Sequence, residues 1–270
     1  MGMEGDQAVD RLRSQLRFKS QDERPRMRRY LRTQRPTVEE QLPACAPAQV
    51  RELAAPVLAD FSMALVRKVR KLYPAMDGAQ VLHFLQDAGA DHLSRAKAVK
   101  ALEQEFKALQ QALKRWVSDR TDYVPEVIPY WDYRLSRSQV REAIECSWRG
   151  LTMLRDPEQR SVPSLALDEM AVGKLPTLPA QIRFEKVKQL SLRNMGLNDE
   201  VAYFLKHFNN LHTLDLSHNQ ITRLPEALSL MPDLTYLYLP RNRLQLTEHT
   251  RKKLGEIRRL KTLNLAHNPL

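Results

Sequence analysis

A short leucine motif recurs after residue 180, and it constrains this chain more than any other feature. Four copies follow the pattern Leu-x-x-Leu-x-Leu-x-x-Asn-x-Leu and begin at residues 187, 211, 234 and 260. A weaker copy begins at residue 162, so successive copies start 25, 24, 23 and 26 residues apart. One such copy cannot bury its leucines alone, because a single short strand has no partner to cover it. The sequence therefore predicts a stack of strand-bearing units.

The spacing and residue types are typical of leucine-rich repeats, whose period is about 20–29 residues. Within each copy two leucines two positions apart are expected to point into the core, as Leu214 and Leu216 do in the third copy. The turn position is asparagine in the last three copies: Asn219, Asn242 and Asn268. Methionine replaces it in the first two copies, so we expect an asparagine ladder that begins only at the third.

A different periodicity precedes the repeats. Apolar residues there recur at three- and four-residue steps, which predicts helices. The expected helices span about Val50–Leu72, Val81–Leu85, Ser94–Ser118 and Ser136–Trp148, and residues 119–133 are expected to form a loop.

The predicted fold class is α plus α/β: an N-terminal helical domain followed by a leucine-rich-repeat solenoid of about five repeats. The expected parts are a mobile basic leader (1–46), the helical domain (47–155) and the solenoid (160–270). The last copy of the motif ends at Leu270 without a polar cap, so we expect a solenoid truncated at its C-terminus.

Positive charge is in excess, with a formal net charge of +11. It is densest in residues 17–35 and 251–261. Solvated surface is the favoured interpretation, and nucleic-acid or membrane binding through the basic leader is the alternative. The sequence shows neither a signal peptide nor an apolar run long enough to span a membrane, so a soluble chain is expected.

Catalytic and cofactor motifs are absent from the sequence. The only cysteines are Cys45 and Cys146, which excludes a disulfide framework and a cysteine-rich zinc module. The histidines are not spaced as metal ligands, and neither a glycine-rich phosphate loop nor a Gly-x-Ser-x-Gly elbow occurs. We therefore expect no cofactor, no metal and no enzyme activity in this chain.

The concave face of the solenoid is the predicted binding surface, because such faces are the usual contact surfaces of repeat proteins. Tyrosine and arginine are enriched among the residues that dominate interface energetics. The predicted partner-binding residues are Arg193, Asp215, Tyr236, Tyr238, Arg241 and Asn264. The alternative is that these tyrosines simply coat an exposed sheet.

Three segments resemble a known group of proteins: Leu102–Trp116, Arg137–Trp148 and Leu175–Leu197. They are similar to large leucine-rich-repeat effector and toxin-like proteins of Gram-negative bacteria, notably pseudomonads, of the IpaH/NEL type. The resemblance covers roughly residues 55–270. It implies a dermonecrotic-toxin-like part before the repeats and often a ubiquitin ligase domain after them.

The resemblance assigns no catalytic residue to this chain. The family's ligase domain uses a cysteine in a Cys-x-Asp motif, whereas Cys45-Ala-Pro and Cys146-Ser-Trp do not match it. The expected function is a protein-interaction module of a bacterial effector that a specialised system secretes into a host cell. The alternative is the substrate-recognition part of a ubiquitin ligase, with the ubiquitin machinery as partner and the catalytic domain beyond residue 270.

Overall fold

The computed structural model describes residues 62–121, 130–245 and 247–269. Its helices are α4 (Met63–Leu72), α5 (Gly78–Asp87), α6 (His92–Ser118), α7 (Tyr130–Trp148), α8 (Val201–Leu205) and α9 (Glu248–Gly255), with a 3₁₀ helix η2 (Glu226–Leu230). Its strands are β1 (Met153–Arg155), β2 (Ser161–Ala166), β3 (Gln189–Ser191), β4 (Thr213–Asp215), β5 (Tyr236–Tyr238) and β6 (Thr262–Asn264). The basic leader and the predicted helical residues 47–61 lie outside the described residues.

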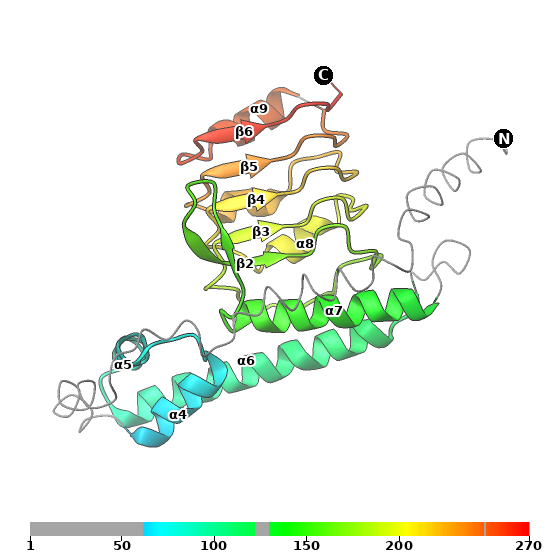
Figure 1. Ribbon diagram of the computed structural model, residues 1–270. Coiled ribbons are helices and arrows are strands. Elements are labelled where there is room, and N and C mark those ends of the chain that lie inside the picture. The colour runs from blue at the N-terminus through cyan, green and yellow to red at the C-terminus, as the bar shows by residue number, and fades with distance from the viewer. Residues whose placement is uncertain (1–61, 122–129, 246, 270) are drawn as a thin grey trace.

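The strands form one six-stranded sheet in the order in which they follow along the chain (Figure 1). Strands β2 to β6 are parallel and each comes from one copy of the leucine motif, whereas β1 pairs antiparallel with β2. The register places Leu190, Leu214 and Leu237 side by side, and all three are fully buried. Stacking therefore supplies the burial that a single copy lacks.

Asparagine side chains tie neighbouring turns together from the third copy onward, as predicted. The Asn219 amide oxygen accepts from the backbone N–H groups of Met195 and Leu197 at 3.2 and 3.0 Å. Its nitrogen donates to the carbonyl of Leu192 in the preceding copy at 2.8 Å. Asn242 and Asn268 repeat this arrangement one and two copies later.

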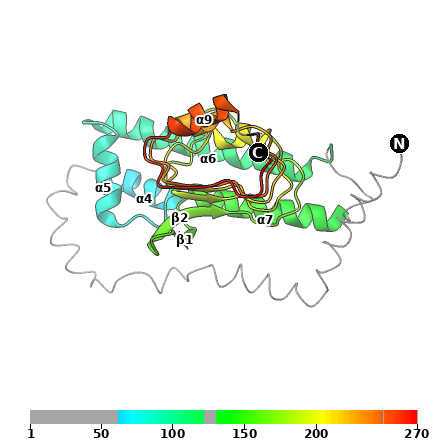
Figure 2. The same ribbon diagram turned by 90° about the horizontal axis from the view of Figure 1, so that it is seen from above.

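The long helices cover the β2 end of the stack. Helices α6 and α7 lie side by side there (Figure 1), and α7 contacts β2. Buried side chains of the helices and of the repeats belong to one continuous hydrophobic cluster. Seen along the stack, α9 lies on one side of the strands and the β1–β2 hairpin on the other (Figure 2). The division of the chain into two domains stays a prediction.

The prediction for the start of α7 was wrong. The helix begins at Tyr130, so Ser136 lies inside it and the predicted loop ends earlier. Two buried residues one turn apart explain the extension, namely Tyr133 and Arg137. The Arg137 guanidinium lies over the rings of Trp116 and Tyr133 and donates to the carbonyl oxygens of Trp116 and Val172 at 2.6 and 3.0 Å. A buried arginine breaks the apolar pattern on which the prediction rested.

Replacing Asn219 with alanine should destabilise the protein by about 3 kcal/mol, because the backbone N–H groups of Met195 and Leu197 lose their buried acceptor. Urea unfolding measures this change in the free energy of unfolding. The matched control is Asn210→Ala, since Asn210 is only partly buried and, among the described residues, its amide donates to a single carbonyl, that of Glu185. That control should cost under about 1 kcal/mol, and equal losses in both variants would contradict the ladder's role.

His207 should make stability fall as the pH drops. Burial lowers the pKa of His207, and its Nδ1 lies 2.9 Å from the carbonyl oxygen of Ile182. The unfolded chain takes up a proton near pH 6.5 while the folded chain resists, so stability is lost below about that pH. The pKa of His212 is lowered in the same direction by desolvation and the charge of Lys188.

Melting temperatures between pH 7.5 and 5.5 test this. His207→Gln should reduce the fall in melting temperature over this pH range, and His212 should account for the fall that remains. The same substitution at the exposed His249 should not reduce it. An unaltered pH profile in His207→Gln would show that His207 is protonated freely in the folded protein.

Candidate partner-binding surface

Side chains that point away from the leucine core form what we call the open face of the sheet, the counterpart of the predicted concave face. Because successive strand residues point to opposite sides, two rows of side chains cross this face. The first row is Ser164, Gln189, Thr213, Tyr236 and Thr262. The second row is Ala166, Ser191, Asp215, Tyr238 and Asn264.

Tyr238 and Asp215 are direct neighbours in the second row, on β5 and β4. Burial raises the pKa of Tyr238, and the charge of Asp215 raises it further. The Asp215 carboxylate accepts hydrogen bonds from the backbone N–H and the hydroxyl of Ser217. Among the described residues the Tyr238 hydroxyl has no hydrogen-bond partner, so it is available to a partner molecule.

Tyr236 is already engaged by the chain itself. Its hydroxyl donates to Oε1 of Glu158 at 2.6 Å, across 78 residues of sequence. Glu158 belongs to the loop between β1 and β2 (residues 156–160), which we call the hairpin loop. The sequence placed the two tyrosines side by side as equivalent binding residues, but only Tyr238 has a free hydroxyl in the described structure.

Glu158 also faces two cations. Arg160 Nη1 lies 3.0 Å from its Oε2, and Lys261 Nζ lies 3.6 Å from its Oε1. The hydrogen bond from Tyr236 lowers the pKa of Glu158, and the charges of Arg160 and Lys261 act in the same direction. The same hydrogen bond raises the pKa of Tyr236. Sequence reasoning missed Glu158, because β1 and its hairpin lie outside the repeat pattern.

The other predicted binding residues are placed differently. Asn264 lies in the second row, where its side chain accepts from the backbone N–H of Ala266 at 3.0 Å. Arg193 follows the second row along β3 and lies 3.9 Å from the Glu169 carboxylate. Both therefore border or belong to the open face.

Arg241 departs from its predicted place on the strand face. Its backbone has a left-handed φ of 54°, and the same turn conformation recurs at His218 and His267. Pro240 takes the position that Ser217 holds one copy earlier, since its carbonyl accepts from the N–H of His218 as that of Ser217 does from Asn194. Arg241 therefore lies in the turn one residue beyond the position equivalent to Ser217, and its role in partner binding stays a prediction.

Within the described part of the chain, three polar atoms of the first row are buried without a hydrogen-bond partner. They are Ser164 Oγ, Gln189 Oε1 and Thr213 Oγ1, on three neighbouring strands. Ser164 and Thr213 are only 1% and 4% exposed, although both belong to the face that points away from the core. Such unpartnered groups are unfavourable in a folded protein.

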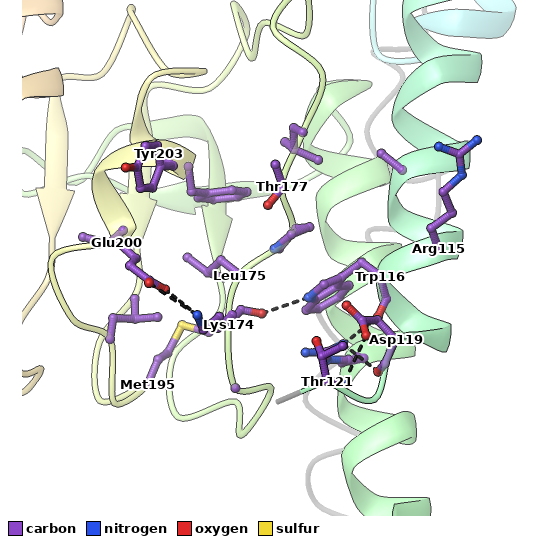
Figure 3. A pocket seen from close by; sticks show the side chains of 18 of the residues that line it. Arg115, Trp116, Asp119, Thr121, Lys174, Leu175, Thr177, Met195, Glu200 and Tyr203 are labelled. Atoms are coloured by element: carbon purple, nitrogen blue, oxygen red, sulfur yellow. Dashed lines mark hydrogen bonds and ion pairs between the residues drawn. The ribbon is translucent and has the colours of Figure 1, made fainter. Parts of the chain in front are cut away.

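A groove of about 910 Å³ lies elsewhere, between the end of α6 and the early repeats (Figure 3). The Trp116 indole donates to the Lys174 carbonyl oxygen at 2.8 Å, and Lys174 pairs with Glu200 at 3.1 Å. These contacts join the helices to the repeats.

The described part of the chain holds no group of three or more histidine, cysteine or carboxylate side chains that could bind a metal ion. Cys146 lies in α7 and is partly buried rather than fully buried. Within the same residues, none of the helices combines the length and the apolar character needed to cross a membrane.

Comparison with known proteins supports the repeats. Residues 185–244 match the model of the family "Leucine rich repeat". The chain is 31% identical over 121 residues to the septation initiation network scaffold protein cdc11 of Schizosaccharomyces pombe. That match covers 43% of this chain but only 12% of the yeast protein.

Among solved structures, InlP of Listeria monocytogenes matches with a TM-score of 0.32 and 27% identity, over 40% of this chain and 28% of the other. The family match covers three of the strands, so the total of five repeats stays a prediction. Leucine-rich repeats generally mediate protein–protein interaction, and residues 185–244 of this chain carry repeats that match this family.

Proposed function

We propose that the open face binds a protein partner, with Tyr238 and Asp215 at the centre of the contact. The observation that carries this proposal is the Tyr238 hydroxyl, which has no hydrogen-bond partner among the described residues and lies on the strand beside Asp215. A partly buried tyrosine offers a large contact area at a low entropic cost, together with a polar group for orientation. Arg193 and Asn264 would extend the contact at its border and along the row.

A binding role also agrees with the repeat family and with the word "scaffold" in the name of the yeast relative. Because this chain spans about an eighth of that relative, the likeness concerns the repeats and not the activity of the whole protein. Binding of a protein partner is therefore proposed on the residues of the face itself.

Two narrower functions rest on the resemblance to IpaH/NEL-type bacterial proteins. The first is recognition of a host protein by a secreted effector, and the second is substrate recognition for a ubiquitin ligase. For the second, we propose that this chain lacks ligase activity, because Cys146 is partly buried within α7 and has no Cys-x-Asp context. A ubiquitin-discharge assay tests that proposal, and activity of this chain would refute it. Nucleic-acid or membrane binding by the basic leader concerns residues outside the described structure.

Tyr238→Ala should weaken binding of a captured and purified partner by about tenfold or more, because both the ring and the free hydroxyl are lost. Calorimetric titration measures the dissociation constant. The melting temperature should change by no more than about 2 °C, because the side chain is not part of the leucine core. Tyr238→Phe keeps the ring, so its effect on the dissociation constant measures the contribution of the hydroxyl alone.

The matched control is Tyr203→Ala. Tyr203 is 66% exposed and lies on helix α8, not on a strand of the open face. This variant should bind as tightly as the parent chain. Unchanged affinity in Tyr238→Ala, or an equal loss in Tyr203→Ala, would remove the open face from the proposal.

A further inference from the structure

The hairpin loop spans several strands of the open face. It leaves the sheet at β2, yet its Glu158 hydrogen-bonds to Tyr236 on β5 and pairs with Lys261 just before β6. Neighbouring strands lie roughly 4.8 Å apart, so the loop reaches roughly 14 Å across the first row. In Figure 1 the hairpin rises along the sheet toward β4 and β5.

The three unpartnered polar atoms of the first row lie on the strands that the loop spans. Ser164, Gln189 and Thr213 come from β2, β3 and β4, which precede the strand that Glu158 contacts. Ser164 and Thr213 are buried, and among the described residues the polar atoms of all three side chains lack a hydrogen-bond partner. Polar groups that are desolvated but unpaired favour any ligand that can pair with them.

Contacts of Glu158 itself are easily exchanged. Its side chain is 39% exposed, Lys261 is 68% exposed, and ion pairs between exposed groups contribute little to stability. Arg160 would not be left unpaired by the loss of Glu158, because it also pairs with Asp156 at 2.7 Å. The Asp156 side chain is 5% exposed, so this second pair anchors the loop's own turn.

Charge around Glu158 favours an acidic occupant. Lys188 directly precedes Gln189, the first-row residue of β3, and Lys261 directly precedes Thr262, the first-row residue of β6. The nearby carboxylate of Asp233 is already paired with Arg259 at 2.6 Å. The acidic side chains beside this area include Asp156, which is paired with Arg160 at 2.7 Å, and Asp215 in the second row.

Building on the proposed function, we infer that Tyr236 and Lys261 form a carboxylate subsite, which Glu158 occupies as an internal stand-in. The occupant is an extended acidic segment of a protein partner. Its carboxylate takes the place of Glu158 on the Tyr236 hydroxyl and the Lys261 ammonium group. Its polar groups pair with Ser164 Oγ and Thr213 Oγ1 once the hairpin loop has moved.

Glu158→Ala tests the stand-in directly, with a decaglutamate peptide as the probe. Removing an internal competitor raises the fraction of binding-competent molecules, so the dissociation constant should fall by about threefold or more. Fluorescence anisotropy of the labelled peptide gives this constant in the full chain, and decaglutamine should not bind. The exposed position of Glu158 makes loss of folding a minor concern, and the melting temperature checks it.

Matched controls separate the subsite from net charge. Glu256→Ala removes one negative charge from exposed residues at the end of α9 and should leave decaglutamate affinity near that of the parent chain. Tyr236→Phe in the Glu158→Ala background removes the donor and should cancel the gain. In the parent chain, added decaglutamate should speed amide hydrogen exchange in residues 156–162.

A gain no larger than that of Glu256→Ala, or one that survives Tyr236→Phe, would overturn the subsite. Tighter binding of RNA or of anionic vesicles in place of decaglutamate would overturn the choice of a protein partner. If Tyr238→Ala impairs binding of the purified partner while Glu158→Ala leaves decaglutamate binding unchanged, the proposed function stands and this inference fails. If Tyr238→Ala has no effect, the proposed function fails instead.

Discussion

Buried asparagine amides hold the strand stack together, and the rest of the structure depends on them. Each strand pairs over only three residues, so a large share of the backbone in every copy lies in turns that the stack buries. An unpaired buried backbone group is costly, and Asn219 and Asn242 satisfy such groups in two copies at once. The leucines can then pack without leaving polar backbone exposed to an apolar core.

The same stacking produces the open face. Because the parallel register is uniform, residues at one position of the motif become neighbours in space although they are about 24 residues apart. Tyr238 and Asp215 meet in this way. The hairpin loop is not part of this repeated register. Its Glu158 contacts Tyr236 on β5, a strand that lies 78 residues further along the sequence. The open face is therefore built from the repeated motif, whereas the hairpin loop that contacts it lies outside the motif.

Much of the fold was predictable because its signals are local and periodic. Leucines at fixed spacing predicted the parallel strands. The turn position is methionine in the second copy and asparagine (Asn219) in the third, which predicted where the amide ladder starts. The first turns of α7 were missed because Arg137 is buried through contacts with Trp116 and the backbone, which no periodicity encodes. Arg241 was misplaced because Pro240, and not Arg241, occupies the position that Ser217 holds one copy earlier.

The sequence by itself determined the repeated strands, their leucine core and the residues that line the open face. The reason is that each copy of the motif places its leucines and its outward-facing residues at the same positions. Only the tertiary structure decided which of those residues are free. It gave the Tyr238 hydroxyl no partner among the described residues, joined Tyr236 to Glu158 and buried polar atoms of the first row. These outcomes depend on contacts between segments as many as 78 residues apart, and such contacts produce no periodic pattern in the sequence from which they could be predicted.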